Sequence, residues 1–149
     1  MSRQSASIVI RRPAAEVFAY MDDISREHEW QPNLLSAEQD PPGSSTVGTR
    51  KRYVSRFLGK EVANTYVVTE LDAGRRVAYE TEPGSTVDAR SEMILATEGD
   101  GTRVTMFVEG KPKGVLRFVP AAMLEAAYRN ELNSTLGRLK ERLEENEQV

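Results

Sequence analysis

The sequence predicts an α+β fold in which one long C-terminal helix covers an antiparallel sheet. Apolar residues recur at helical spacing over about two dozen residues, from Pro120 to about Glu145. Between Asn33 and Lys111 the apolar residues follow a period of two, and turn residues interrupt them. Because the helical and strand patterns occupy separate parts of the chain, we expect separate layers of helix and sheet.

The composition is that of an ordinary globular protein. Its 149 residues are 39% hydrophobic and 29% charged, so we expect a single domain over residues 1–149. The chain has no cysteine and one histidine, which excludes disulfides, thiolate metal sites and zinc centres built on a histidine pair. We therefore expect neither a metal site nor a cofactor.

Charge and hydropathy also restrict the partners. A net charge of −3 argues against nucleic acid, whose phosphates need a basic surface. No apolar run approaches the length of a transmembrane segment, although transient contact with a membrane surface stays open. The first residues lack the apolar core of a signal peptide, so the cytoplasm is the expected location. The sequence does not distinguish a monomer from a homodimer.

The chain begins with a strand and two short helices. The strand is Ser7–Ile10, an apolar run of strand-forming residues. Pro13 then opens a helix whose apolar residues fall at i, i+3, i+4 and i+7. Ser25 is suited to cap a second short helix, which Gln31–Pro32 ends.

Six further strands follow, joined by short turns. Consecutive strands on short turns pair as antiparallel neighbours. Glu98–Gly101 is a strong hairpin signal, because it contains two glycines between alternating segments. The six predicted strands are Leu34–Gln39, Thr49–Phe57, Glu61–Leu71, Arg76–Thr81, Asp88–Thr97 and Thr102–Glu109.

The long helix has two unlike halves. Its second half is rich in leucine and should pack densely, whereas Ala121–Tyr128 is made of small or flexible side chains that leave room. We therefore expect a cavity beneath the first half, with Trp30 near its entrance. The apolar stripe consists of Leu124, Tyr128, Leu132, Leu136, Leu139 and Leu143.

Four segments of the sequence carry a family resemblance. They are the Ile10–Asp23 segment with its Pro-x-x-x-Val-Phe motif, the Trp-x-Pro motif within His28–Pro32, and the hairpins Val68–Val77 and Gly99–Thr105. In order and spacing they resemble the START-like, or SRPBCC, superfamily, which includes polyketide cyclase/dehydrase-like and lipid-transfer domains. The resemblance implies a helix-grip fold, in which a seven-stranded antiparallel sheet wraps around the long C-terminal helix and encloses a ligand cavity. The superfamily shares no catalytic set, so the resemblance implies a pocket but no reaction.

Polar, aromatic and flexible apolar side chains on the predicted sheet and helix are the candidates to line that cavity. Each strand has two faces, and the sequence leaves open which face points inward. Tyr128 lies on the apolar stripe, where its hydroxyl either meets a ligand or bonds within a packed core. The candidate ligand-binding residues are Trp30, Tyr53, Asn64, Tyr66, Tyr79, Arg90, Glu92, Met93, Met106, Met123, Ala127 and Tyr128.

Three other features have two interpretations each. We favour an exposed position for His28 over a role as general base. Gly110–Gly114, which has a glycine at each end, and the apolar Val115–Val119 after it form either a lid or a packed connection to the long helix. Five basic residues form a cluster around one predicted hairpin: Arg50, Lys51, Arg52, Arg56 and Lys60. This cluster is either a solvated face of the sheet or a surface that attracts anions, and we favour the solvated face.

Three functions are compatible with these observations. The preferred one is binding of a small hydrophobic ligand, such as a lipid or a polyketide-like molecule, with carriage of that ligand as an option. The second is a cyclase or dehydratase, a lyase that uses Tyr, Arg or Glu side chains as acid–base groups on such a ligand. The third is a protein-interaction domain with a filled core. A buried ionisable group with a shifted pKa favours the second function, and an open cavity argues against the third.

Overall fold

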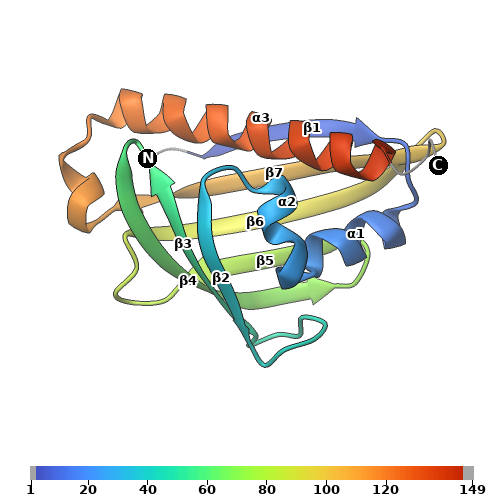
Figure 1. Cartoon of the computed structure of the whole chain (residues 1–149), viewed down its shortest axis with the longest axis horizontal. Coiled ribbons are helices and arrows are strands. Elements are labelled where there is room, and N and C mark those ends of the chain that lie inside the picture. Colours follow the sequence, from blue (N-terminus) through green and yellow to red (C-terminus); the bar gives the residue numbers. More distant parts are fainter. Residues whose placement is uncertain (1–2, 146–149) are drawn as a thin grey trace.

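The computed structural model of the chain describes residues 3–145 and shows a seven-stranded antiparallel sheet with a long helix along one face (Figure 1). The strand order is β1-β7-β6-β5-β4-β3-β2, so the first strand pairs with the last. This confirms the α+β helix-grip fold. The strands are β1 (Gln4–Ile10), β2 (Leu34–Asp40), β3 (Arg50–Phe57), β4 (Lys60–Asp72), β5 (Arg76–Thr81), β6 (Val87–Glu98) and β7 (Gly101–Pro112).

Strand pairing explains where the strands end. β1 begins at Gln4 and not at Ser7, because Gln4–Ala6 pair with Val108–Met106 of β7. A polar segment next to an established strand gains ladder hydrogen bonds that its own composition does not predict. The sheet bends at register shifts between Leu34 and Ser36 and between Val68 and Glu70. Such bulges increase the local twist and help the sheet to curl around the helix.

Three short helical segments follow β1. They are α1 (Ala14–Asp22), the 3₁₀ turn η1 (Ile24–Arg26) and α2 (Glu27–Trp30). The residue that caps η1 is Asp23 and not Ser25, since an Asp23 carboxylate oxygen accepts from the Ser25 amide at 3.0 Å. Asp is at least as good a cap as Ser, and it stands two residues earlier.

The long helix α3 (Ala121–Glu145) packs its second half into the main core. Leu136, Leu139 and Leu143 are each at most 2% exposed, as predicted. Leu132 differs because it is only partly buried. A smaller cluster lies under the first turns of α3, where Leu124 packs with Phe57, Val62 and Leu116.

The segment before α3 forms the 3₁₀ turn η2 (Gly114–Phe118) and packs as a connection. Leu116 is 1% exposed within the smaller cluster, whereas Phe118 is 77% exposed. Within residues 3–145, no helix combines the length and hydrophobicity needed to cross a membrane.

The prediction for the basic cluster was wrong at one residue. Lys51 is fully buried, and its ammonium lies 3.1 Å from a carboxylate oxygen of Asp22 in α1. The cause is strand alternation, which turns Lys51 inward with Tyr53, Ser55 and Phe57. The other four members, Arg50, Arg52, Arg56 and Lys60, are exposed.

Candidate functional site

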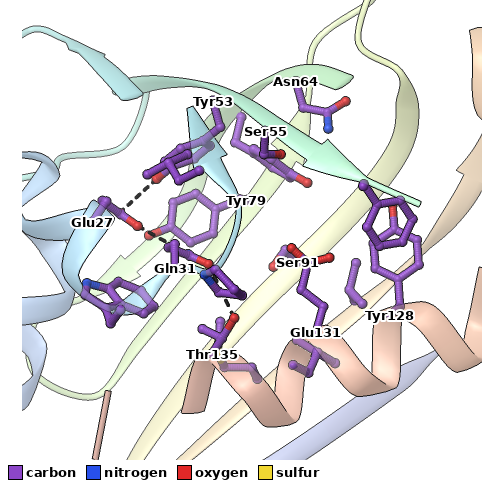
Figure 2. A pocket seen from close by; sticks show the side chains of 18 of the residues that line it. Glu27, Gln31, Tyr53, Ser55, Asn64, Tyr79, Ser91, Tyr128, Glu131 and Thr135 are labelled. Atoms are coloured by element: carbon purple, nitrogen blue, oxygen red, sulfur yellow. Dashed lines mark hydrogen bonds between the residues drawn. The ribbon is translucent and has the colours of Figure 1, made fainter. Parts of the chain in front are cut away.

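A cavity of about 180 Å³ lies between the inner face of the sheet and the middle of α3 (Figure 2). Its walls come from α1, α2, β2–β7 and α3, and include Phe57, Val62, Met93 and Leu132. An apolar cavity of about 150 Å³ is large enough to hold benzene, so this one can hold an aromatic guest of at least that size. A cavity of this size contradicts the alternative of a filled core.

The cavity lies further along α3 than the sequence predicts. The α3 residues that line it are Tyr128, Glu131, Leu132 and Thr135, and not the alanine-rich turns before them. Those first turns do not stand off the sheet, because Leu124 and Ala127 pack in the smaller cluster with Leu116 of η2. The cavity therefore lies between the two clusters, and both contribute residues to its walls.

Three tyrosines form a row across neighbouring strands. Tyr53 on β3, Tyr66 on β4 and Tyr79 on β5 have ring centroids 6.0 and 6.3 Å apart. They lie side by side because each occupies an inward position on a paired strand. At the other end of the cavity, the ring centroid of Tyr128 lies 4.7 Å from that of Phe57.

The tyrosine hydroxyls differ in their partners. The Tyr53 hydroxyl donates to Glu27 at 3.0 Å. By contrast, the hydroxyls of Tyr66, Tyr79 and Tyr128 form no hydrogen bond with any residue in 3–145. Burial raises the pKa of Tyr66 to about 12 and raises the pKa values of Tyr79 and Tyr128 as well. All three are therefore neutral groups that can donate to or accept from a ligand.

Glu27 is the most deeply buried carboxyl group of the cavity. It begins α2, is 2% exposed, and accepts from Tyr53 at 3.0 Å and from the Gln31 amide at 3.2 Å (Figure 2). Burial raises the pKa of Glu27 to about 7, although the charge of Lys51 and the two hydrogen bonds oppose that change. Burial disfavours the charged form of a carboxyl group.

A second carboxyl group, Glu131, projects from α3 into the cavity (Figure 2). Burial raises its pKa to about 7. No residue in 3–145 forms a hydrogen bond or an ion pair with it. Glu131 is close enough to Tyr66 and Tyr128 for its charge to raise the pKa values of both phenols.

Sequence reasoning missed both carboxyl groups, although a signal for each exists. Glu27 stands three residues before Trp30, and Glu131 stands three residues after Tyr128. Residues three apart share a helix face, so each acid lies on the face of an aromatic candidate. An acidic residue on a short or charged helix is usually exposed, which is why neither was selected.

A family model described as "Polyketide cyclase / dehydrase and lipid transport" matches residues 1–144 of the chain. The chain belongs to this family. The family description covers both an enzymatic and a carrier activity, and the fold and cavity described above fit it. A comparison with curated proteins gives no match.

Solved structures share the fold of this polyketide cyclase/dehydrase and lipid transport family member. TTHA0849 from Thermus thermophilus has 20% identity and a TM-score of 0.83, covering 97% of this chain and 99% of that one. A START superfamily protein from Mycobacterium smegmatis has 14% identity and a TM-score of 0.79, with coverages of 96% and 97%. The di-domain ARO/CYC BexL of the BE-7585A biosynthetic pathway has 19% identity and a TM-score of 0.72, covering 97% of this chain and 47% of that one. At these identities the likeness concerns the fold.

In this family member, the structure brings eight of the twelve candidate residues to the cavity wall. Among them, the Asn64 side-chain oxygen also accepts from the backbone amide of Val87 at 3.2 Å, which links β4 to the start of β6. Trp30 is only 1% exposed, so it belongs to the inner wall and not to an entrance as the sequence suggests. The eight residues are Trp30, Tyr53, Asn64, Tyr66, Tyr79, Met93, Met106 and Tyr128.

The other four candidates lie elsewhere. Arg90 and Glu92 alternate with the inward Met93, so they lie on the outer face of β6 and pair with Glu80 at 3.2 Å and Arg76 at 3.1 Å. Met123 is 56% exposed. Ala127 packs against the smaller cluster and not the cavity.

The site has no obvious metal ligands or catalytic set. Residues 3–145 contain no group of three or more His, Cys, Asp or Glu side chains that could hold a metal ion. His28 is exposed on α2, in agreement with the favoured interpretation. Among the described residues, the ionisable groups that face the cavity are Glu27, Glu131 and the four tyrosines.

Proposed function

We propose that the protein binds a small, mostly apolar ligand that bears hydrogen-bonding oxygen groups, in the cavity between the sheet and α3. The observation that carries the proposal is a cavity whose wall is apolar but presents three tyrosine hydroxyls without partners among residues 3–145. The family description, which joins polyketide cyclisation to lipid transport, supports a ligand of this kind.

The side chains of the cavity wall indicate that most of the ligand is apolar. Phe57, Val62, Met93, Met106 and Leu132 all line the cavity. Transfer of apolar surface from water to such a site is favourable and proportional to the area removed from water. The flexible methionine side chains adapt to guests of different shape.

The tyrosine hydroxyls of the cavity wall indicate that the ligand carries oxygen groups. A tyrosine hydroxyl that a bound ligand covers needs a hydrogen-bond partner, and one that is covered without a partner costs about 1–3 kcal/mol. A ligand with carbonyl or hydroxyl groups would satisfy Tyr66, Tyr79 and Tyr128, whereas a plain alkyl chain would leave them unpaired. A polyketide-like molecule therefore suits the cavity better than a simple lipid tail does.

Filling the cavity tests the proposal. Ser91 lines the cavity from β6, while its neighbour Arg90 lies on the opposite face and is exposed. The Ser91→Leu variant should fill the space and weaken binding of the fluorescent probe 2-naphthol by about tenfold or more. The matched control, Arg90→Leu, adds the same side chain to the outer face and should change the affinity by less than about threefold.

The thermal midpoint, measured on the same samples, separates a cavity from a packed core. An equal or higher midpoint for Ser91→Leu together with weaker probe binding supports the proposal. Unchanged 2-naphthol affinity in Ser91→Leu contradicts it. Native mass spectrometry of gently purified protein gives an independent readout, because a retained small molecule would add its mass to the wild-type chain but not to Ser91→Leu.

A second function, cyclase or dehydratase chemistry, is favoured by one observation. Two carboxyl groups with pKa values raised to about 7 face the cavity, and groups that titrate near the working pH are efficient general acids and bases. Deuterium exchange at the methyl carbon of acetophenone in D₂O, followed by NMR, measures proton abstraction next to a carbonyl. Wild-type protein should accelerate the exchange, and Glu131→Gln should reduce that acceleration at least about tenfold. An exchange rate equal to that of buffer alone argues against this function.

A further inference from the structure

The charges of the cavity wall are all of one sign. Glu27 and Glu131 line the cavity, and no Lys, Arg or His among the described residues 3–145 does so. The nearest buried base, Lys51, does not line the cavity and is bound to Asp22 at 3.1 Å. A carboxylate or phosphate ligand would therefore approach two acidic groups in a poorly solvated space, where the wall itself presents no basic side chain to the ligand.

The two acids are not equivalent. Glu27 already accepts hydrogen bonds from Tyr53 and Gln31, and Lys51 lies near enough to favour its charged form. Glu131 receives neither a hydrogen bond nor an opposite charge from residues 3–145. Of the two, Glu131 is the group whose oxygens are available to a ligand.

We infer that the ligand carries a protonated amine or another compact cationic group, and that Glu131 receives it. This inference rests on the proposed function and adds the charge of the ligand to it. An ammonium group next to Glu131 would form a charge-assisted hydrogen bond, which is stronger than a bond between neutral groups. It would also supply the positive charge that the cavity wall lacks.

The aromatic wall around Glu131 suits the same group. Tyr66 and Tyr128 lie near enough to Glu131 to feel its charge, and the ring centroid of Phe57 lies 4.7 Å from that of Tyr128. Aromatic faces attract cations, and they do so more strongly when water is excluded. Burial alone raises the pKa of Glu131 to about 7, and a bound cation would oppose that effect and favour the carboxylate.

Three probes of similar size test the inference. They are 2-phenylethylamine, 2-phenylethanol and 3-phenylpropanoate, titrated calorimetrically at pH 8, where Glu131 is mostly ionised. On the wild-type chain the amine should bind about tenfold or more tightly than the alcohol, and the carboxylate should bind more weakly than the alcohol. This comparison needs no variant, so it holds even if a variant fails to fold.

The Glu131→Gln variant tests whether the Glu131 side chain causes the preference for the amine over the alcohol. It keeps the shape and removes the charge, so the advantage of the amine over the alcohol should disappear while the alcohol affinity changes by less than about threefold. Glu141→Gln is the matched control, because Glu141 is exposed on the same helix. It should keep the amine advantage.

The outcomes separate this inference from the proposed function. Equal affinity for amine and alcohol on the wild-type chain overturns the inference and leaves the proposed function standing. An amine advantage that survives in Glu131→Gln also overturns it, since the overall net charge of −3 would then explain the preference. Failure of all three probes to bind overturns both.

Discussion

Glu27 shows how one side chain can set the pH dependence of the fold. Burial raises its pKa from 4.5 to about 7. Between those two pH values the folded chain holds a proton that the unfolded chain has released. The stabilising contribution of this proton is therefore complete below about pH 4.5 and is lost as the pH rises through about 7.

The Glu27→Gln variant should remove that dependence. The rise in the pKa of Glu27 from 4.5 to about 7 corresponds to roughly 3 kcal/mol of free energy of unfolding. Between pH 5 and pH 8, wild-type protein should lose on the order of 3 kcal/mol more free energy of unfolding than Glu27→Gln does. Urea unfolding at the two pH values measures the difference. Glu141→Gln removes an exposed carboxyl group and should follow the wild type; parallel curves for wild type and Glu27→Gln would contradict the assignment.

Lys51 is the second residue whose burial has a measurable consequence. It is fully buried, and its ion pair with Asp22 is 3.1 Å long. Removing one partner of a buried pair leaves the other charge uncompensated, so Lys51→Met should cost about 3–5 kcal/mol in urea unfolding. Arg52→Met is the control, because Arg52 is exposed on the same strand and should change stability by less than about 0.5 kcal/mol. A loss for Lys51→Met as small as that of the control would show that the pair contributes little.

For individual residues, the sequence identified candidate side chains but not which face of its strand each side chain lies on. It selected Tyr53, Tyr66 and Tyr79 as candidates, and alternation then placed them inward together. It also selected Arg90 and Glu92, which the same alternation places outward. The inward positions of β6 include Ser91, so polarity alone does not distinguish its two faces. The face is decided by pairing across the whole sheet, which no single strand reveals.

At the scale of elements, α3 is held by its leucines. Leu136 is 1% exposed within the main core. Leu136→Ala should lower the free energy of unfolding by about 2–5 kcal/mol, the range for a large-to-small change in a packed core. Leu35→Ala removes a leucine that is 50% exposed and should cost less than about 1 kcal/mol. A loss under about 1 kcal/mol for Leu136→Ala would contradict the packing of α3 against the sheet.

The sequence alone could not predict the position of the cavity along α3. The alanine-rich turns suggested space beneath Ala121–Tyr128, but Leu116 of η2 and Phe57 of β3 fill it. Both residues belong to other elements of the chain, and helix periodicity carries no information about such contacts. The opening appears instead where Glu131 and Thr135 face the sheet between two packed clusters.

For the whole molecule, the order of strands and helices was predictable and the chemistry of the site was not. Short turns leave antiparallel neighbours as the natural pairing from β2 to β7, and the family resemblance implies that seven strands form one sheet. The pairing of the first strand, β1, with the last, β7, comes from the structure alone. The cavity chemistry depends on Glu27 from α2, the tyrosines of three strands and Glu131 from α3. These groups become neighbours only in the folded chain, so their burial and shifted pKa values follow from the assembled structure.

The last prediction concerns divalent metals and the molecule as a whole. Its only histidine, His28, is exposed, the chain has no cysteine, and residues 3–145 hold no group of three potential metal ligands. Glu27 is already committed to Tyr53 and Gln31, so the cavity acids do not form a ready set of oxygen ligands. We therefore expect EDTA to change the affinity for 2-naphthol by less than about twofold. A loss of 2-naphthol binding in EDTA that one divalent ion restores would contradict this prediction, because it would show that a bound metal ion is needed for the site. Glu131 would then be expected to bind that metal ion and not an amine.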